Sequence, residues 1–348
     1  MSPKKMNVAV MEEIGRVELQ IRDVPIPKDD EVLVKLEAVG VCGSDLHYYE
    51  KGAIGSAVVE FPFVLGHEAG GVVVELGKDV KHLKIGDRVA LEPGVPCYKC
   101  ECCLDGKYNL CPDVFFFATP PDDGVFQEYI AHPAAFCFKL PENLSSIEGA
   151  LIEPLAVSFH SAILGGAMIG QKVLVFGAGC IGLTCMMACK AMGVNEVIVV
   201  DIMDKRLDKA LELGATHVIN GAKEDVLEKV KELTGGEGID LTLETSGAEI
   251  AANQAIFAAK PASTIVFIGY SASGNMDLSL GQALDKELTF KTVFRYRHVY
   301  PIAIEAVASG KVNLKDMVTH EFTLDNIQDA LDECVRDKEN IVKGVITI

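Results

Sequence analysis

The stretch "KVLVFGAGCIG", residues 172–182, constrains the fold more than any other part of the chain. An apolar run ends in the pattern G-x-G-x-x-G, formed by Gly177, Gly179 and Gly182, and helical periodicity follows it. Such glycines let the backbone turn tightly and approach a pyrophosphate, whose charge then lies at the positive end of the helix that begins near Ile181. The stretch therefore predicts a strand, a phosphate-binding turn and a helix.

Strand-like and helical segments keep alternating after this turn. Helices are expected near residues 205–213 and 224–234, and strands at "EVIVVD" (196–201), "HVIN" (217–220), "IDLTLE" (239–244) and "TIVFIG" (264–269). Alternation of this kind is typical of a parallel, doubly wound α/β sheet. We therefore predict a Rossmann-type domain for this part of the chain.

The remaining sequence has a different pattern. Before about residue 155, short β-branched runs such as "EVLVKLEAVG" and "GGVVVELG" predict a mostly antiparallel β region. After about residue 295 there are two helical stretches, near 302–309 and 327–337, and a closing apolar strand "VKGVITI". Periodicity alone does not settle to which domain these last segments belong.

Asp201 ends the strand that follows the glycine turn, close to the roughly 20 residues expected for a dinucleotide site. A carboxylate there can accept hydrogen bonds from the adenosine ribose hydroxyls and repels the extra phosphate of NADP, so NAD is the predicted cofactor. We assign Ile181, Arg206 and Thr245 to the same site. The alternative is that the glycines only pack a helix against the sheet and that Asp201 caps the next helix.

Length and charge limit the possible partners. A chain of 348 residues is expected to form two domains. Its 32 basic and 50 acidic side chains give a net charge of −18, which disfavours nucleic acid and anionic membranes and favours small-molecule ligands. The amino-terminal segment lacks the apolar region of a secretory signal, and the uncharged run 173–189 is interpreted as buried core. A cytoplasmic protein is predicted.

Eleven cysteines in such a chain are expected to be reduced. Four of them follow the spacing C-x2-C-x2-C-x7-C, which suits a closed, structural zinc site: Cys97, Cys100, Cys103 and Cys111. Cys102 is interpreted as a bystander, although it could replace Cys103, and a reduced cluster without an ion is the alternative. The other cysteines lie in apolar or helical segments and are expected in the core: Cys137, Cys180, Cys185, Cys189 and Cys334.

Two further stretches, "GVCGSDLHYYE" (40–50) and "VLGHEAGGVVVELG" (64–77), bring together other metal ligands. Cys42, His67 and Glu68 offer one sulfur, one nitrogen and one oxygen, a donor set typical of an open, catalytic zinc site. Adjacent side chains of a strand diverge, so His67 and Glu68 can face one ion only where the backbone turns. Nearby glycines make such a turn possible: Gly66, Gly70 and Gly71.

The second stretch continues as "GHEAGGVVVELGKDV", which matches G-H-E-x2-G-x5-G-x2-V and resembles the signature of zinc-containing medium-chain alcohol dehydrogenases. "CGSD", "GDRVA", the cysteine loop and "GAGCIG" follow in that family's order. Other segments resemble its sorbitol and xylitol dehydrogenase branch, and together they cover nearly the whole chain: "HYYEKGAIG", "ATPPDDGVFQEY", "KLPENLS", "EGALIEPLAV" and "VFRY".

The resemblance implies a domain arrangement and a zinc site. It predicts a mostly β, GroES-like catalytic domain (1–154), an NAD-binding Rossmann domain (155–294) and a tail (295–348) that returns to the catalytic domain. Cys42, His67 and Glu68 would hold the catalytic zinc. Glu153 would lie near it, either through water or as an exchanging ligand.

The resemblance also assigns roles to residues around the zinc. Ser44 and His47 occupy the positions of the proton relay, and Asp45 that of a partner which orients His67. Tyr48 is expected either in the wall of the substrate pocket or in ordinary packing.

Arg295 and Tyr296 would bind polyol hydroxyls by the same resemblance, although Arg295 could equally form an interface ion pair. Arg297 departs from the pattern, because an uncharged residue is commoner there, and this leaves the fit of the substrate open.

The predicted function is an NAD- and zinc-dependent polyol dehydrogenase that oxidises a sorbitol- or xylitol-like polyol to its 2-ketose. The alternatives are a dehydrogenase of another secondary alcohol, such as threonine, a diol or a phosphorylated polyol, and a non-catalytic nucleotide-binding protein of the same fold. Similarity alone suggests a homotetramer.

Overall fold

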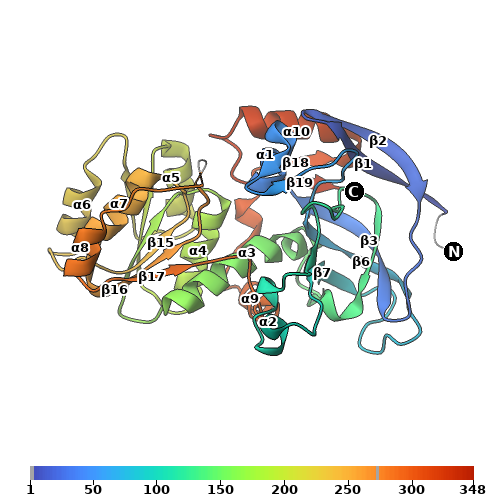
Figure 1. Ribbon diagram of the computed structural model, residues 1–348, viewed down its shortest axis with the longest axis horizontal. Coiled ribbons are helices and arrows are strands. Elements are labelled where there is room, and N and C mark those ends of the chain that lie inside the picture. Colours follow the sequence, from blue (N-terminus) through green and yellow to red (C-terminus); the bar gives the residue numbers. More distant parts are fainter. Residues whose placement is uncertain (1–3, 272–273) are drawn as a thin grey trace. The chain divides into compact units, whose positions relative to one another are not determined.

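A computed structural model describes residues 4–271 and 274–348 of the protein (Figure 1). The chain divides into two compact units, Met1–Glu153 with Leu314–Ile348 and Pro154–Asn313. The predicted domain bounds differ from this division chiefly at residues 295–313. After this segment, Lys315 forms an ion pair with Glu148 of the first unit, and Thr319 is hydrogen-bonded to Val342 and Lys343 within the returning tail.

A seven-stranded, mostly antiparallel sheet forms the centre of the first unit. β3 (Glu31–Gly40) pairs antiparallel with β6 (Glu68–Leu76), β10 (Tyr129–Pro133) and β19 (Gly344–Thr347). The sheet order is β11-β7-β6-β3-β19-β18, so the end of the chain adds two strands beside β3. β3 reads "EVLVKLEAVG", and its valines and leucines are buried because neighbouring strands and covering residues surround it.

The other elements of the first unit surround this sheet. They are the strands β1 (Lys5–Glu13), β2 (Arg16–Asp23), β4 (Ala53–Ile54), β5 (Ala57–Val58), β7 (Arg88–Leu91), β8 (Gly94–Val95), β9 (Phe115–Phe116), β11 (Cys137–Lys139) and β18 (His320–Thr323), and the helices α1 (Gly43–Lys51), α2 (Glu101–Leu104) and α10 (Ile327–Arg336). Short 3₁₀ helices are η1 (Tyr108–Leu110), η2 (Ala134–Phe136), η3 (Lys315–Met317) and η4 (Leu324–Asn326).

The second unit contains a six-stranded sheet in the order β14-β13-β12-β15-β16-β17, and all neighbouring strands are parallel. Its strands are β12 (Lys172–Phe176), β13 (Glu196–Asp201), β14 (His217–Asn220), β15 (Ile239–Glu244), β16 (Ala259–Phe267) and β17 (Thr289–Thr292). Its helices are α4 (Cys180–Ala191), α5 (Asp204–Glu212), α6 (Val226–Leu233), α7 (Glu249–Ala258), α8 (Leu280–Asp285) and α9 (Tyr300–Ala308). The predicted α/β fold with a doubly wound parallel sheet and a mostly β region is confirmed.

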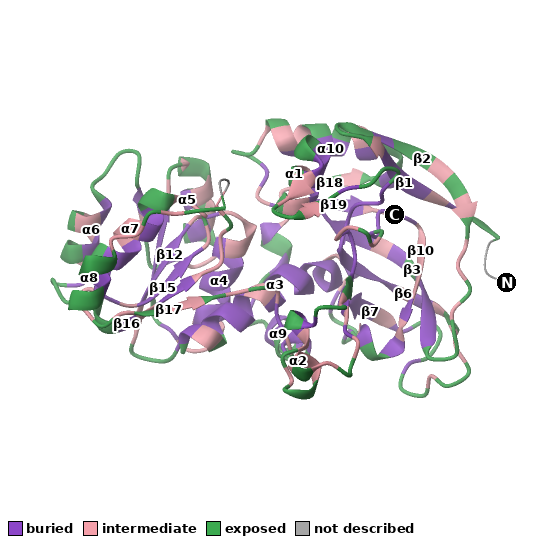
Figure 2. Ribbon diagram, viewed as in Figure 1, coloured by how far each residue is buried: buried purple, intermediate pink, exposed green. Residues whose placement is uncertain are grey.

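Helix α3 (Ser146–Gly165) crosses the division between the units and is apolar along its length. Its 20 residues and mean hydropathy of 1.3 would be sufficient for a membrane span by length and composition alone. However, 78% of its most apolar window is buried inside the protein, as in the core helix of a globular fold. The uncharged run 173–189 corresponds to β12 and α4, whose central residues are likewise buried (Figure 2).

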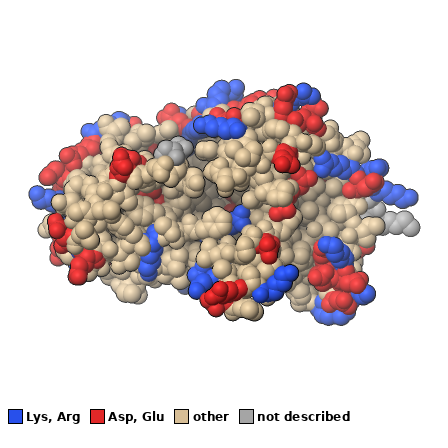
Figure 3. Space-filling view, viewed as in Figure 1, with Lys and Arg blue, Asp and Glu red and all other residues tan. Residues whose placement is uncertain are grey.

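Charged side chains of both signs lie on the surface. On the face drawn in Figure 3, Lys and Arg stand among Asp and Glu side chains of the described residues rather than forming a basic strip. This distribution and the net charge of −18 favour small ligands over polyanions.

Candidate active site and metal centres

Helix α1 positions the first metal-ligand candidate. Cys42 precedes the helix in an extended conformation, and its backbone N–H donates to Oδ2 of Asp45 at 3.0 Å. An acidic side chain in the first turn is favourable because it satisfies a free N–H group near the positive end of the helix. Gly52 ends the helix with a left-handed backbone. The helix thus has a defined start and end, and Cys42 lies in the short connection between β3 and α1.

Asp45 joins this helix to the second ligand segment. It is fully buried; Oδ1 accepts the Gly66 N–H at 2.9 Å and lies 3.5 Å from Nδ1 of His67. Burial raises the pKa of Asp45, but His67 and the backbone N–H groups of Cys42 and Gly66 together outweigh this effect, and the pKa lies below its usual value. Burial lowers the pKa of His67, whereas the charges of Asp45 and Cys42 raise it well above its usual value. With Nδ1 directed to Asp45, the other ring nitrogen is available as a ligand.

The glycines near His67 have two different purposes. Gly66 has a φ of 91°, a conformation that favours glycine, and supplies the predicted turn. The prediction is wrong for Gly70 and Gly71, which lie within β6. A Cβ at either position would lie 2.2 Å from a backbone oxygen, of Ser146 and Lys35 respectively. These two glycines permit close packing rather than a turn.

The ligand atoms of Cys42, His67 and Glu68 lie within 4.8 Å of one another. Glu68 is the first residue of β6 and is fully buried, while Cys42 is half-buried. One thiol, one imidazole and one carboxylate can serve as three ligands of a zinc ion and leave a further position open. The side chains therefore fit a metal of the catalytic type.

The other residues predicted around this site differ in exposure. Ser44 is half-buried on α1, whereas His47 is exposed, with Nδ1 3.2 Å from the carbonyl oxygen of Gly43. Tyr48 is buried in the core and packs edge-on against Phe63. This contact corresponds to the packing alternative.

Glu153 is buried on α3 near Glu92, and it does not belong to the group of converging ligand atoms found among the described residues. Burial raises the pKa of Glu92 to about 7, and the charge of Glu153 adds to this effect.

The four-cysteine loop also brings its ligand atoms together. The sulfurs of Cys97, Cys100, Cys103 and Cys111 lie within 4.8 Å of one another, and none of these cysteines forms a disulfide. Cys102 lies outside this group, as its interpretation as a bystander requires. Backbone N–H groups, chiefly that of Lys99, lower the pKa of Cys97 to about 7. Four thiols with one already inclined to ionise fit a closed tetrahedral zinc site.

In the second unit, the three glycines of the turn are each explained by a different local geometry. Gly177 has a φ of 93°, and a Cβ there would lie 2.8 Å from Oγ1 of Thr245. A Cβ at Gly182 would lie 1.8 Å from the carbonyl oxygen of Gly177. At Gly179 the nearest atom is Nη1 of Arg206, at 3.7 Å. The first and third glycines are thus required by the turn itself, and the second leaves an open approach to the start of α4.

Asp201 holds the turn from the end of β13. Its Oδ2 accepts the N–H of Ala178 at 2.7 Å, and its Oδ1 accepts those of Ile202 and Met203. The residue that caps α5 is Met203, so Asp201 does not occupy the N-cap position. Its carboxylate fixes the geometry of the glycine turn.

Ile181 and Thr245 lie beside this turn. Ile181 is in the first turn of α4, and the hydroxyl of Thr245 donates to the carbonyl oxygen of Phe176 at 2.7 Å. The residues assigned to the cofactor therefore surround the carboxyl ends of β12, β13 and β15.

The predicted substrate residues follow β17. Arg295 has a φ of 54° and its guanidinium lies 4.8 Å from the ring centre of Phe294. Tyr296 is buried and its ring centre lies 5.7 Å from that of Tyr300. Burial lowers the pKa of His160 to about 4, and the charge of Arg297 contributes to this shift. Arg295 and Arg297 thus lie in one short segment, and Arg297 is near enough to His160 to affect its pKa.

The comparisons with known proteins identify the family of the chain. Residues 28–142 match the alcohol dehydrogenase GroES-like domain, and residues 180–309 match the zinc-binding dehydrogenase family. An uncharacterized zinc-type alcohol dehydrogenase-like protein of Escherichia coli is 43% identical, with 99% of both chains covered. Sorbitol dehydrogenase of Bacillus subtilis is 41% identical (99% of this chain, 98% of the other), and the human enzyme 45% (91% and 89%).

The chain belongs to the zinc-containing medium-chain alcohol dehydrogenases, in the sorbitol dehydrogenase branch.

Solved structures of this family superpose closely on the chain. An E. coli oxidoreductase/dehydrogenase of unknown specificity has a TM-score of 0.95 at 43% identity, with 99% of both chains covered. An E. coli alcohol dehydrogenase in complex with NADH has a TM-score of 0.92 at 30% identity (99% and 100%). Galactitol-1-phosphate dehydrogenase of E. coli has a TM-score of 0.91 at 28% identity (99% and 100%). The resemblance seen in the sequence is thus confirmed.

One partner of this dehydrogenase's metal-ligand residues, Lys343, was missed by sequence reasoning. Nζ of Lys343 lies 2.6 Å from Oε1 and 2.5 Å from Oε2 of Glu68, and both side chains are 1% exposed. The signal that could have indicated it is a single charge within the otherwise apolar closing segment "VKGVITI", since a buried lysine needs an acidic partner.

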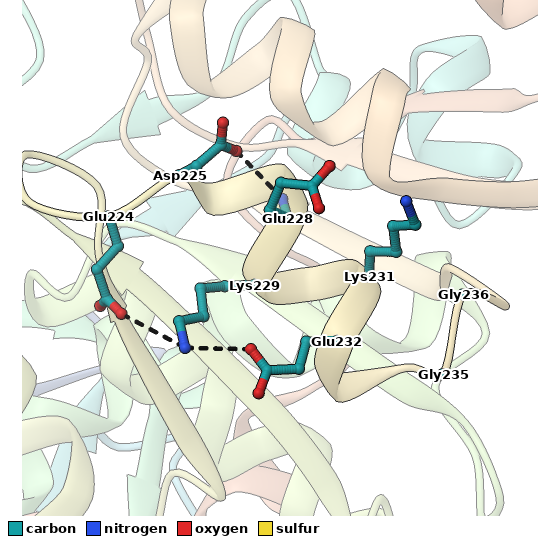
Figure 4. Close-up of a pocket in the computed structure, with 8 residues that line it drawn as sticks. All are labelled: Glu224, Asp225, Glu228, Lys229, Lys231, Glu232, Gly235 and Gly236. Atoms are coloured by element: carbon teal, nitrogen blue, oxygen red, sulfur yellow. Dashed lines mark hydrogen bonds and ion pairs between the residues drawn. The ribbon is translucent and has the colours of Figure 1, made fainter.

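A surface hollow of about 620 Å³ lies beside α6 in the second unit (Figure 4). Four carboxylates and two ammonium groups line it, so it carries a net charge of −2. Lys229 pairs with Glu224 and Glu232, while Asp225 caps the helix. We assign no role in this dehydrogenase to the residues that line it: Glu224, Asp225, Glu228, Lys229, Lys231, Glu232, Gly235 and Gly236.

Proposed function

We propose that the protein is a cytoplasmic, NAD- and zinc-dependent polyol dehydrogenase that oxidises a sorbitol- or xylitol-like polyol at C2 to the ketose. The observation that carries this proposal is the convergence of Cys42, His67 and Glu68 in a chain that also has a complete dinucleotide-binding turn. The sorbitol dehydrogenases among its relatives support the substrate class.

In the proposed reaction, Cys42, His67 and Glu68 hold the catalytic metal. A bound zinc acts as a Lewis acid that lowers the pKa of a coordinated hydroxyl, as it does for water. Asp45 keeps the His67 ring oriented, because its Oδ1 lies 3.5 Å from Nδ1 of His67 while two backbone N–H groups hold its own carboxylate. Glu153 acts near the metal through a water molecule or as an exchanging ligand.

Two residues of helix α1, Ser44 and His47, provide the path by which the proton leaves the site. Ser44 is half-buried and His47 is exposed, so a proton can pass from the hydroxyl of Ser44 to His47 and on to solvent. Histidine suits this role because its pKa lies near neutrality. Tyr48 stays in the core and supports the helix through its contact with Phe63.

NAD is the proposed hydride acceptor. The glycine turn and the start of α4 receive its pyrophosphate, and Asp201 receives the ribose hydroxyls and disfavours NADP. Ile181, Arg206 and Thr245 complete this site. Removal of hydride from the polyol carbon and loss of its hydroxyl proton then yield the ketose.

A second candidate is a secondary alcohol that carries an anionic group, such as a phosphorylated polyol. Arg295 and Arg297 lie in one short segment, and Arg297 acts electrostatically on His160. Galactitol-1-phosphate dehydrogenase is among the solved relatives. The overall charge of −18 opposes an anionic substrate, so the neutral polyol with Arg295 and Tyr296 as hydroxyl-binding residues is the first choice.

A panel of neutral and phosphorylated polyols, diols and threonine, assayed with NAD and NADP, tests this proposal. The assay is run on zinc-loaded protein, after chelation and after zinc is restored. We expect kcat/KM to be greatest for a neutral polyol with NAD and to fall to background on chelation. NAD binding without turnover of any alcohol would contradict the proposal and favour a non-catalytic nucleotide-binding protein. Light scattering would test the predicted homotetramer.

A further inference from the structure

Glu244 ends β15 at the point where the order of the parallel strands reverses. The strands β12, β13 and β14 run outward on one side of this point, and β15, β16 and β17 run outward on the other. In doubly wound sheets a dinucleotide binds across such a point, with one half on each side. Glu244 is paired in register with Phe176 of β12 and Phe267 of β16, so it lies at the centre of the edge where the cofactor binds.

The carboxylate of Glu244 is fully buried and holds the turn that follows β15. Oε1 accepts the N–H of Ser246 at 2.8 Å, that of Gly247 at 3.1 Å and the hydroxyl of Ser246, and Oε2 lies 3.2 Å from the nitrogen of Gly247. Burial raises the pKa of this carboxyl group, against the opposing effect of the same donors. A change in the shape of this turn would leave buried oxygens without their donors, which is costly.

The backbone of Glu244 holds a second turn, the one that follows β16. Its carbonyl oxygen accepts the N–H of Ile268 at 2.8 Å and that of Gly269 at 3.0 Å. The two turns are also in direct contact. A Cβ at Gly247 would lie 2.3 Å from the carbonyl oxygen of Tyr270, and a Cβ at Gly269 would lie 2.2 Å from the backbone nitrogen of Gly247. Because these contacts are between backbones, a displacement of the first turn also displaces the second.

The glycine turn after β12 is supported by a different residue, Thr245. The hydroxyl and the backbone N–H of Thr245 both donate to the carbonyl oxygen of Phe176, at 2.7 Å and 3.0 Å. A Cβ at Gly177 or Gly182 would lie 2.8 Å or 3.0 Å from Oγ1 of Thr245. The carboxylate of Glu244 instead binds the two residues that follow Thr245. The glycine turn therefore has supports of its own.

We propose that Glu244 is a positioning residue for the nicotinamide half of NAD, because its carboxylate fixes the turns after β15 and β16 on which that half binds. This inference deepens the proposed function and rests on it, since it requires NAD at this edge of the sheet. The adenosine half binds on the other side of the reversal, at the glycine turn that Asp201 holds. Loss of the carboxylate should therefore weaken binding of the whole dinucleotide and leave binding of its adenosine half nearly unchanged.

The test measures by calorimetry the Kd of two ligands, NADH and ADP, of which ADP has only the adenosine and pyrophosphate groups. Glu244→Ala removes every contact of the carboxylate, whereas Glu244→Gln keeps one oxygen that can accept the N–H groups of Ser246 and Gly247. Ile239→Val is the matched control. Ile239 is buried at the opposite end of β15, and its truncation destabilises the same strand without touching the turns.

We expect the Kd for NADH to rise about tenfold in Glu244→Ala, which is the scale of one lost hydrogen bond to a charged group. The Kd for ADP should stay nearly unchanged. Glu244→Gln should regain most of the affinity for NADH. Ile239→Val should lower the Tm and leave both Kd values unchanged, which separates the positioning of one half of the cofactor from a general loss of stability.

Equal weakening of NADH and ADP in Glu244→Ala, or an unchanged Kd for NADH, would overturn the role of Glu244 and leave the proposed function intact. If Glu244→Ala does not fold, Ser246→Ala decides, because Ser246 is exposed and its hydroxyl donates to Glu244. We expect this variant to lose affinity for NADH alone, by a smaller factor, and the same two outcomes would count against the proposal. A wild-type protein that binds ADP but not NADH would instead refute the cofactor of the proposed function, and this inference with it.

Discussion

The carbonyl oxygen of Gly177 lies 1.8 Å from the position that a Cβ at Gly182 would occupy. The two glycines are therefore in direct contact, and the third glycine of the motif closes the turn. Because the obstacle is backbone, a side chain at residue 182 must displace the turn itself.

We expect Gly182→Ala to weaken NAD binding strongly and to destabilise the second unit, since forced overpacking costs about 1–3 kcal/mol or more. Gly281→Ala is the control, because a Cβ there meets nothing within 4 Å and its φ is not positive. Titration with NADH, followed by the fluorescence of its nicotinamide, and thermal melting check both variants. NAD affinity in Gly182→Ala equal to that of the control would contradict this explanation of the motif.

Asp201 allows the choice of cofactor to be separated from the shape of the turn. Asp201→Asn keeps an oxygen that can accept the Ala178 N–H but loses the negative charge, whereas Asp201→Ala loses both. We expect the ratio of kcat/KM for NADP to that for NAD to rise about tenfold or more in both variants, by the scale of one charge-assisted hydrogen bond. Asp201→Ala should reduce thermal stability more than Asp201→Asn, because the amide keeps one of the two acceptor oxygens that hold the N–H groups of Ala178, Ile202 and Met203. If the ratio of kcat/KM for the two cofactors is unchanged in both variants, Asp201 does not bind the ribose hydroxyls.

Cys42→Ser tests the catalytic metal separately from the cofactor. Cys42 contributes its thiol to the metal group, while its backbone N–H holds Asp45 and does not depend on the side chain. We expect turnover to fall to background and the zinc content to drop, with the Kd for NAD nearly unchanged. Wild-type kcat in this variant would exclude Cys42 from the site.

The cysteine loop should act on stability rather than on chemistry. Cys100→Ser removes one of the four converging thiols, so we expect the loss of about one equivalent of zinc and a lower Tm, because a structural zinc contributes to folding. Cys102→Ser, which alters a neighbouring cysteine outside the group, should keep both values. Full zinc loading of Cys100→Ser would rule out a structural ion held by these four residues, and loss of zinc from Cys102→Ser would mean that Cys102 is a ligand.

Local patterns in the sequence predicted most of the fold. The strand–glycine–helix pattern near Gly177 and the acidic residue at 201 are short-range features, and the structure gives both a clear geometric reason. The ligand group was predicted from spacing and resemblance, although the purposes of Gly70 and Gly71 were mistaken. Those glycines serve contacts with Ser146 and Lys35, which are distant in sequence and leave no periodic pattern.

Lys343 was missed for a related reason. Its partner Glu68 lies 275 residues away, and only the pairing of β19 with β3 and of β3 with β6 brings the two together. Sequence reasoning identified an apolar final strand but could not fix its neighbours, because periodicity describes one strand and not its register. Ion pairs between residues far apart in the sequence, such as Lys343 and Glu68, could therefore not be predicted.

His132 should make stability depend on pH. Its ring is 1% exposed, lies 4.7 Å from that of Phe117 and has Nε2 2.8 Å from the carbonyl oxygen of Glu92. Burial lowers its pKa to about 4, against the opposing effects of the Glu92 carbonyl and Glu31. In the unfolded chain the pKa of His132 is near 6.5. Between pH 4 and 6.5 the unfolded chain therefore binds a proton at His132, whereas the folded protein does not. The stabilisation is thus present above pH 6.5 and is lost as the pH falls towards 4, by on the order of 3 kcal/mol.

His132→Gln keeps an N–H donor for the Glu92 carbonyl but does not titrate. We expect its Tm to fall less steeply than that of the wild type between pH 6.5 and 5, since one source of proton uptake on unfolding is removed. His217→Gln, at an exposed position, should retain the wild-type slope. Calorimetric Tm values of the zinc-loaded proteins across this range provide the comparison, because acid loss of zinc affects all three alike. Parallel curves for the wild type and His132→Gln would show that His132 is not the buried neutral group described here.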